Sequence, residues 1–420
     1  MTLKPETPDR PDEPDEPDER RAASRSVAAS TSRGRLVSLD QFRGFTMLGM
    51  LVVNFLGSYD VCPRLLQHTH DYCSFADTIM PQFLFAAGFS LRLTLRARLE
   101  RDGRVPWGRL MRRVAALSAI AIIWYSIADA ADLLARLRTQ PLPEVLAVCG
   151  KRQWFQTLLH IAATTLWISP VVLCRPRTRL LFALASAALH VGLSWWFLFD
   201  WVHAAPRAID GGPPGFLSWC LPAIAGTLAC DLVRDCTAHQ RSSALPKLSA
   251  LGCLLCGGGW LLSQPTVLYS VPAASAPQPQ LAADAVIPHP DRFAAWNGQF
   301  AEPPFVPPPP SQQRQWNYWM MTQRACSISY TLFTAGVSCL VFGGFRMACD
   351  LRGRESALLR TLGTNSLAAY ILHDVVGWCV SPFLSHDAAF VSVLAGLALF
   401  IATTAGACRL LELRGWYLRV

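Results

Sequence analysis

The chain has 420 residues, of which 52% are hydrophobic and 16% are charged. Soluble domains carry about 25% charged residues, so the composition excludes an ordinary soluble domain and indicates a protein with several membrane spans. The formal net charge is +9, but the arginines cluster between apolar segments, as membrane topology signals do, and we therefore expect no nucleic-acid partner.

Residues 1–34 form a polar segment that opens with PETPDRPDEPDEPDERR. A segment with so few apolar residues cannot bury enough surface to fold. It also lacks the apolar stretch that follows the basic start of a signal peptide. We expect a disordered Pro/acidic tail, with the membrane domain in residues 35–420.

Apolar segments long enough to cross a membrane, about 20 residues each, recur along the rest of the chain. Ten are predicted, at 37–57, 75–95, 112–132, 153–173, 178–199, 215–233, 246–264, 326–346, 361–383 and 388–408. The main arginine clusters fall on one side only if there are about ten spans and the N-terminus is cytoplasmic. The predicted fold is an all-α, polytopic transmembrane helical bundle with cytoplasmic N- and C-termini.

Two segments fit this topology less directly. Residues 132–152 carry four basic residues on the predicted outer side, which an amphipathic interfacial helix would explain. Residues 265–325 form a long Pro-rich loop, predicted to be external, whose proline run favours polyproline II. A loop of this length is usually functional or disordered.

The cysteines do not form a secreted-type framework. Cys253 and Cys256 lie in an apolar segment, where cysteine is typically a small hydrophobic residue. Cys62 and Cys73 lie in the polar connection after the first span. They are candidates for a disulfide if that connection faces an oxidising space.

The first predicted span carries polar residues at both ends. Asp40 and Arg43 are one helical turn apart at the cytoplasmic end. Arg43 either marks the cytoplasmic side, with Asp40 starting the helix, or the pair contacts a phosphate-bearing cofactor. Asn54 lies near the outer end, where it either bonds a neighbouring helix or acts in a site.

The connection to the second span is rich in ionisable residues. His68, His70, Asp71 and Asp77 lie within ten residues. A histidine can accept a proton near neutral pH, and a carboxylate such as Asp77 can hold its other nitrogen. The alternatives are exposed loop histidines and, for Asp77, a helix N-cap. No further ligand cluster accompanies the two histidines, so we expect no metal.

Polar residues are fewer in the later spans. Gln156 and His160 are one turn apart, and Asn365 and His373 are eight residues apart on one predicted helix face. With His70, these four residues are candidates for lining a cavity, because ionisable groups inside a membrane usually serve function. An isolated histidine among apolar residues, such as His190, is more typical of a satisfied core residue.

Several motifs resemble one known family, the heparan-α-glucosaminide N-acetyltransferases. They are RLVSLDQFRGFTMLGMLVVN, then a leucine two residues before His68, then ADTIMPQFLFAAGFS. WFQTLLHIA, DGGPPGFLSWCLPAIAGTLAC, WMMTQRACSISYTLFTAGVSCLVF and LGTNSLAAYIL follow in the family's order, so the resemblance covers about residues 35–415. The segment after His68 departs from the family pattern, and both His68 and His70 remain candidates for the base.

The resemblance implies transfer of an acetyl group from cytosolic acetyl-CoA, across a membrane, to the amine of a terminal glucosamine. By similarity, Asn54, His68 and Asp77 match the family's catalytic segment. His68 would take the acceptor's proton or carry the acetyl group, Asn54 would bind the oxyanion, and Arg43 with Asp40 would bind acetyl-CoA. The expected partners are a glycan or amino-sugar acceptor and the lipid bilayer, with a homodimer as a candidate assembly.

The predicted protein is therefore an acetyl-CoA-dependent N-acetyltransferase in a bacterial inner membrane. Two rival interpretations stay open. A polysaccharide O-acyltransferase would use the same histidine chemistry with a hydroxyl acceptor. A transporter of similar architecture would line a path through the membrane with the same polar residues and would consume no thioester.

Overall fold

A computed structural model describes residues 36–234, 243–271, 280–296, 298–310 and 312–418. These residues form an all-α fold in which the only β pairing is two isolated bridges. The predicted disordered tail, residues 1–34, lies outside the described residues, so its disorder stays a prediction.

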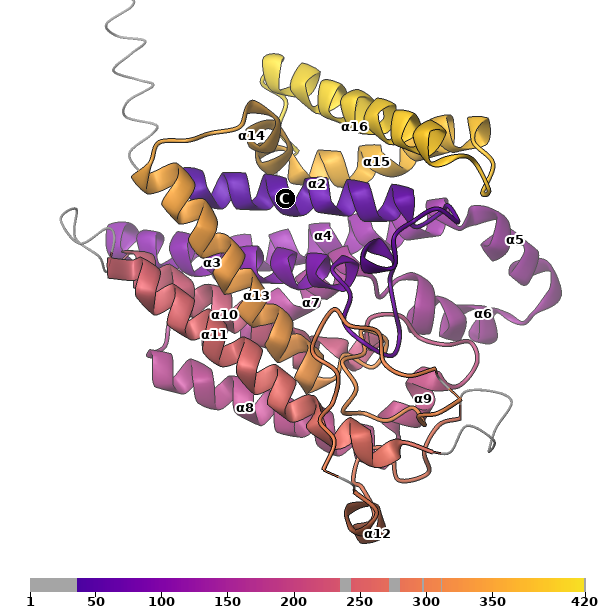
Figure 1. The fold of residues 1–420 in the computed structure, drawn as a ribbon. Coiled ribbons are helices and arrows are strands. Elements are labelled where there is room, and N and C mark those ends of the chain that lie inside the picture. Colours follow the sequence, from indigo (N-terminus) through magenta and orange to yellow (C-terminus); the bar gives the residue numbers. More distant parts are fainter. Residues whose placement is uncertain (1–35, 235–242, 272–279, 297, 311, 419–420) are drawn as a thin grey trace, which may run out of the picture. The chain divides into compact units, whose positions relative to one another are not determined.

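The α-helices follow one another along the chain, and the longest segments that join them lie between α2 and α3 and between α11 and α13 (Figure 1). They are α2 (Val37–Leu56), α3 (Ile79–Asp102), α4 (Trp107–Ala128), α5 (Ala130–Thr139), α6 (Leu142–Val148), α7 (Thr157–Ile168), α8 (Pro176–Leu193), α9 (Phe199–His203), α10 (Phe216–Arg234), α11 (Ala244–Ser263), α12 (Pro290–Ala294), α13 (Ile328–Phe345), α14 (Ala357–Thr364), α15 (Ser366–Val380) and α16 (Phe390–Leu413).

Six helical segments of the described chain are long and apolar enough to cross a membrane. They are Trp107–Ala128, Pro176–His203, Pro213–Arg234, Ala244–Tyr269, Ile328–Leu351 and Phe390–Leu413. The chain is thus an integral membrane protein, and the predicted count of ten spans stays a prediction. Two predicted spans differ from the observed helices: α7 has only 12 residues, and the segment at 361–383 is divided into α14 and α15 at Asn365.

Helix α10 is central to one group of helices. It contacts the other members of this group, α3, α7, α8, α11 and α13. Its backbone touches that of α3 at two glycines. A Cβ added at Gly88 would meet the carbonyl oxygen of Ala223, and one added at Gly226 would meet that of Phe85. Small residues at helix crossings allow this close approach in membrane proteins.

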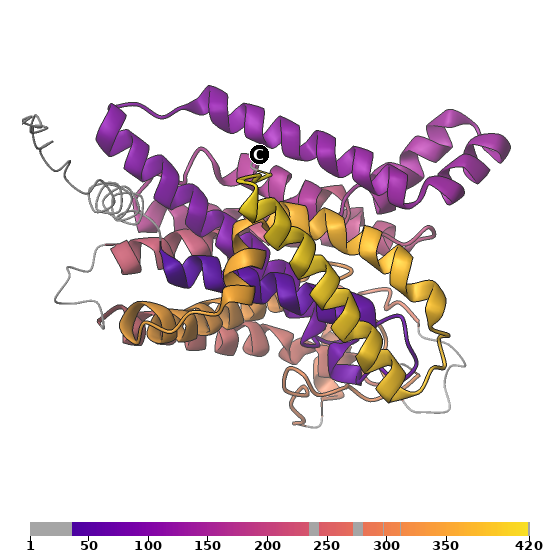
Figure 2. The same cartoon turned by 90° about the horizontal axis from the view of Figure 1, so that it is seen from above.

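Helix α2 lies between that group and the C-terminal helices α15 and α16 (Figure 1), and α16 crosses over it in the view from above (Figure 2). On one side, the ring of Phe42 packs edge-on against Phe85 of α3 and Phe342 of α13. On the other side, the ring of Phe55 stacks on Phe400 of α16, with centroids 5.0 Å apart. The helix therefore carries its polar residues between two packed layers, with Arg43 toward its start and Asn54 toward its end.

The arginine-rich ends of α3, α8 and α10 are joined by a buried ion-pair network. Asp231 of α10 accepts a hydrogen bond of 2.8 Å from Nε of Arg92 and a second bond from Arg179. Nη1 of Arg92 also donates to the carbonyl oxygen of Val172. The side chain of Arg179 is 0% exposed and that of Asp231 is 12% exposed. Each buried charge is therefore compensated by the other and not by water.

Replacing Asp231 with alanine is expected to lower the free energy of unfolding by about 3–5 kcal/mol, because it leaves two arginines buried without a carboxylate. The measurement is thermal unfolding of the purified protein in detergent. Asp102→Ala is the matched control, since Asp102 pairs with the exposed Arg101. Equal melting temperatures for the two variants would show that the network does not stabilise the fold.

Candidate active site

A cavity of about 530 Å³ lies at the Asn54 end of α2. The residues that line it come from α2, the connection after it, the start of α3, residues 152–157, two loops and α15. They are Met50, Val53, Asn54, His68, His70, Ala76, Ile79, Met80, Phe83, Arg152, Gln156, Thr157, Arg207, Ala208, Ile209, Asp210, Gln323, Arg324 and Tyr370. Its size is typical of a small-molecule site.

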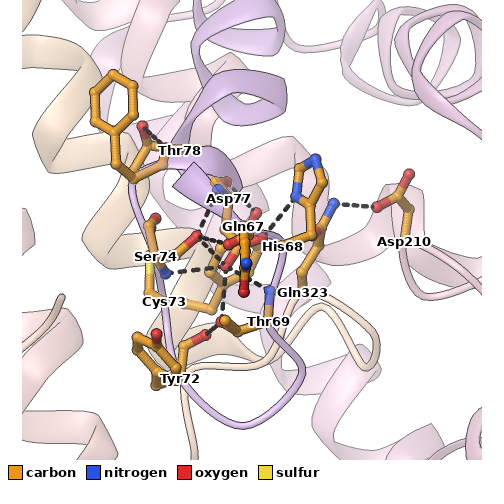
Figure 3. A network of polar contacts seen from close by, with 12 residues as sticks. Gln67, His68, Thr69, Tyr72, Cys73, Ser74, Asp77, Thr78, Asp210 and Gln323 are labelled. Atoms are coloured by element: carbon orange, nitrogen blue, oxygen red, sulfur yellow. Dashed lines mark hydrogen bonds and ion pairs between the residues drawn. The ribbon is translucent and has the colours of Figure 1, made fainter. Parts of the chain in front are cut away.

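His68 lines this cavity with a carboxylate behind it. Its Nδ1 lies 2.9 Å from Oδ1 of Asp77, and the Asp77 side chain is fully buried (Figure 3). The His68 side chain is 44% exposed, because its ring faces the hollow. Since Asp77 occupies Nδ1, the nitrogen left for a ligand is Nε2.

Asp77 is held by its own loop. Its second oxygen accepts hydrogen bonds from the backbone N–H of Ser74 at 2.9 Å, the Ser74 hydroxyl at 3.0 Å and the Thr69 hydroxyl at 3.1 Å. The Tyr330 hydroxyl donates to the Asp77 carbonyl oxygen at 2.6 Å. The N-cap of α3 is Thr78, so the Asp77 carboxylate serves the loop and the histidine.

The surroundings of His68 favour its protonated form. Burial by itself would lower the pKa of His68, but the hydrogen bond and negative charge of Asp77 outweigh it, helped by Asp210 and Gln323, and the pKa is raised. A raised pKa makes the imidazole a stronger base. His68 is therefore equipped to take a proton from a ligand in the cavity.

His70 lines the same cavity but differs in its electrostatics. Burial, reinforced by the positive charge of Arg324, lowers the pKa of His70 to about 4. His70 is therefore neutral at physiological pH and a weaker base than His68. Of the two candidates from the sequence, His68 is the one with a carboxylate partner.

Asp210 and Gln323 are among the cavity residues that were not predicted from the sequence. Asp210 is buried and accepts a hydrogen bond of 2.8 Å from Nε2 of Gln323. Burial raises the pKa of Asp210 to about 6, although Gln323 and the charge of His68 act in the opposite direction. Asp210 has φ of 53°, a conformation that Asp tolerates better than most residues. Asp210 belongs to the motif DGGPPG, and nothing in that motif indicates that His68 lies nearby.

Asn54 lines the cavity from α2 and is backed by α15. Its Nδ2 lies 3.3 Å from Nε2 of His373. Nδ1 of His373 in turn contacts the carbonyl oxygen of Tyr370, which fixes the ring. An amide nitrogen carries two hydrogens, so this contact leaves one N–H of Asn54 for the cavity.

Only some of the other residues predicted to line the cavity do so in the structure. Gln156 lines the cavity as the N-cap of α7 with extended backbone, and it therefore does not share a helix face with His160. His160 is buried against Phe155 and Trp219, outside the lining. Asn365, at the break between α14 and α15, and His373 of α15 are also buried outside the lining.

The predicted cofactor residues lie toward the opposite end of α2. Nη2 of Arg43 donates a hydrogen bond of 2.6 Å to the hydroxyl of Ser366. Asp40 lies one turn earlier, where its carbonyl oxygen faces Gly363 of α14. Helix geometry separates Arg43 from Asn54 by about 16 Å along α2. Arg43 and His68 would therefore contact different parts of a bound molecule.

Cys62 and Cys73, the candidates for a disulfide, are both free thiols in the structure. Among the residues that the structure describes, no three His, Cys, Asp or Glu side chains gather as metal ligands would. The residues that line the cavity offer proton-transfer and hydrogen-bonding groups.

Comparison with known families gives the class of the protein. The acyltransferase domain family matches residues 36–411. The chain belongs to this acyltransferase family. The match covers every residue of the cavity lining, from Met50 to Tyr370. No curated protein matches the chain. Family membership supports an acyltransferase enzyme and disfavours the transporter interpretation.

Proposed function

We propose that this acyltransferase moves an acetyl group from cytoplasmic acetyl-CoA to an amino-sugar-like acceptor on the outer side of a bacterial inner membrane. The observation that supports it most is His68, which faces a cavity with Asp77 bonded to Nδ1. The resemblance to the heparan-α-glucosaminide N-acetyltransferases supplies the donor and the acceptor class. A ten-span topology with cytoplasmic termini would place the arginine-rich helix ends inside and the cavity toward the outside.

The proposed reaction is a direct transfer. Nε2 of His68 takes a proton from the acceptor nitrogen, which attacks the thioester carbonyl carbon. The remaining N–H of Asn54 donates to the oxygen that becomes negative. The carbon–sulfur bond then breaks, and the thiolate leaves as the free thiol after it receives the proton held by His68. Asp77 stabilises the imidazolium in between and keeps Nδ1 protonated.

The donor would lie along α2 in this proposal. Arg43 and Asp40, near the cytoplasmic start of the helix, would contact the phosphate-bearing part of acetyl-CoA. The long flexible arm of the coenzyme would then reach toward Asn54 and His68. These two roles fit the positions of the polar residues on α2, with Asp40 and Arg43 toward its start and Asn54 toward its end.

The proposal is tested with purified protein, isotope-labelled acetyl-CoA and glucosamine as the probe acceptor. We expect acceptor-dependent release of free thiol together with a labelled product that resists mild alkali, as an amide does. A labelled product that mild alkali cleaves would be an ester and would assign a polysaccharide-type O-acyltransferase, which the same histidine chemistry allows. Thioester loss that is independent of every acceptor would contradict transfer altogether.

A further inference from the structure

Three arginines line the cavity beside His68 and take no part in the proposed proton transfer. Arg152 follows α6, Arg207 lies in the loop before Asp210, and Arg324 lies in the loop before α13. They come from segments far apart in the sequence, so their convergence is a product of the fold. Arg324 has its pKa lowered to about 10, first by burial and then by the charges of Arg207 and Arg152.

None of the three guanidinium groups has a hydrogen bond or an ion pair within the part of the chain that the structure describes, and Nη1 of Arg324 is buried without a partner. Several other arginines of the described chain are paired. Arg314, for example, forms two hydrogen bonds with Glu302. A buried donor without a partner is costly, so Arg324 lacks something that a ligand could supply. Arg152 and Arg207 are exposed, and their donors also remain open to a ligand.

The two loop arginines are held in place by an aromatic ring. The guanidinium carbons of Arg207 and Arg324 lie 5.5 Å and 5.9 Å from the centroid of Trp316. Cation–π contacts of this kind orient guanidinium groups without consuming their hydrogen-bond donors. The donors therefore remain available to the cavity.

The carboxylates nearby do not neutralise this charge. Asp77 is bonded to His68 and to its own loop. Asp210 is bonded to Gln323, and its raised pKa of about 6 leaves a fraction of it protonated near neutral pH. His70 is neutral at physiological pH. The cavity thus presents three guanidinium charges against a single lining carboxylate.

We propose that the acceptor of this enzyme is anionic, with a carboxylate, phosphate or sulfate group that Arg152, Arg207 and Arg324 bind in the same cavity as its nucleophile. This inference rests on the proposed function. Guanidinium groups match the geometry of such oxyanions. A cavity of about 530 Å³ suits a unit of sugar size, so the anion and the reacting group belong to one such unit.

The test compares two acceptors that differ by one anionic group, glucosamine and glucosamine 6-phosphate, with acetyl-CoA as donor. We expect the wild-type protein to use the phosphorylated acceptor with a kcat/KM about 10- to 100-fold higher, as charge-assisted hydrogen bonds to a bound anion imply. The preference should fall toward one in Arg324→Gln and in Arg152→Gln. The Arg152 side chain is exposed, so we expect its substitution to leave the fold intact. Arg138→Gln, on the exposed surface of α5, is the control.

The anion bound by the cavity arginines could instead be a phosphate group of acetyl-CoA. If the cavity arginines bind the donor, the Gln variants will raise KM for acetyl-CoA and leave the acceptor preference unchanged, which overturns the inference. Equal use of the two acceptors by the wild-type protein overturns it as well.

A binding measurement separates this inference from the proposed function. Calorimetric titration with inorganic phosphate should show binding to the wild-type protein that weakens at least about tenfold in Arg324→Gln and Arg152→Gln. Phosphate binding with this arginine dependence, in the absence of any acetyl transfer, would refute the proposed function but support the anion site. Transfer to glucosamine without arginine-dependent phosphate binding would support the proposed function but refute the anion site.

Discussion

Replacing His68 with glutamine is expected to lower kcat for acetyl transfer about 10³-fold, because the acceptor then loses its base. Glutamine keeps a polar side chain that can still reach the Asp77 carboxylate, so the loop should keep its structure. The measurement is acceptor-dependent thiol release at saturating acetyl-CoA. His289→Gln is the matched control, since His289 lies at the N-cap of the remote helix α12.

Two further observations make the His68 prediction specific. The glutamine variant should melt within a few degrees of the wild-type protein, and added imidazole should restore part of the activity of His68→Ala by entering the space left in the cavity. If His68→Gln retains transfer and His70→Gln loses it, the base is His70 and the assignment made from the carboxylate contact is wrong.

Replacing Asp77 with asparagine is expected to lower kcat about 10²- to 10⁴-fold, although Asp77 does not line the cavity. The oxygen of the introduced amide can accept the Ser74 and Thr69 bonds, so the NH₂ group of that amide would face Nδ1 of His68. Nδ1 would then have to accept, and the proton would move to Nε2, the nitrogen that must take the acceptor's proton.

The pH dependence separates this positioning role from a general loss of structure. His68 must be neutral to act, so the rate should fall as pH drops below its raised pKa. Removing the negative charge of Asp77 lowers the pKa of His68, and the acidic limb of the profile should move to lower pH while the maximum decreases. Asp60→Asn, at an exposed position of the same connection, should change neither. An unshifted acidic limb in Asp77→Asn would contradict the role.

The local part of the site could be predicted from the sequence. His68 and Asp77 are nine residues apart in one connection, and Asn54 ends the helix before it. Residues this close along the chain, between two segments that are both predicted to enter a membrane, have few ways to separate. The sequence therefore indicated a shared hollow, and the structure places Asn54 and His68 in one lining with Asp77 behind. Their roles in catalysis stay predictions.

The distant part of the site could not be predicted. Asp210, Gln323, Arg207 and Arg324 lie in loops whose composition is ordinary for surface segments, and Arg152 lies in the short helical turn Cys149–Gln153. Only tertiary packing brings these residues to His68. The hydrogen bond from the Gly211 N–H to the Arg324 carbonyl oxygen, at 2.9 Å, joins two of these loops. Apolar periodicity carries no information about such a contact.

Hydropathy alone also does not predict where a helix is interrupted. The apolar segment at 361–383 was predicted as one span, but the chain breaks at Asn365, where Gly363 lies directly against the backbone of α2. A window of average hydropathy does not register one residue that changes the direction of the backbone. The same limit applies to α7, whose apolar stretch extends into turns after Ile168.

The cavity wall draws on the chain from Met50 to Tyr370, and this has a consequence for biosynthesis. While the ribosome is still adding the middle helices, the growing polypeptide already holds its imidazole and carboxylate but lacks most of the chamber around them. Such a nascent chain should not transfer acyl groups, because most of the cavity wall that would hold donor and acceptor together is still missing. Activity should begin only when the last third of the polypeptide has entered the bilayer, and two separately expressed halves should be inert until they are mixed.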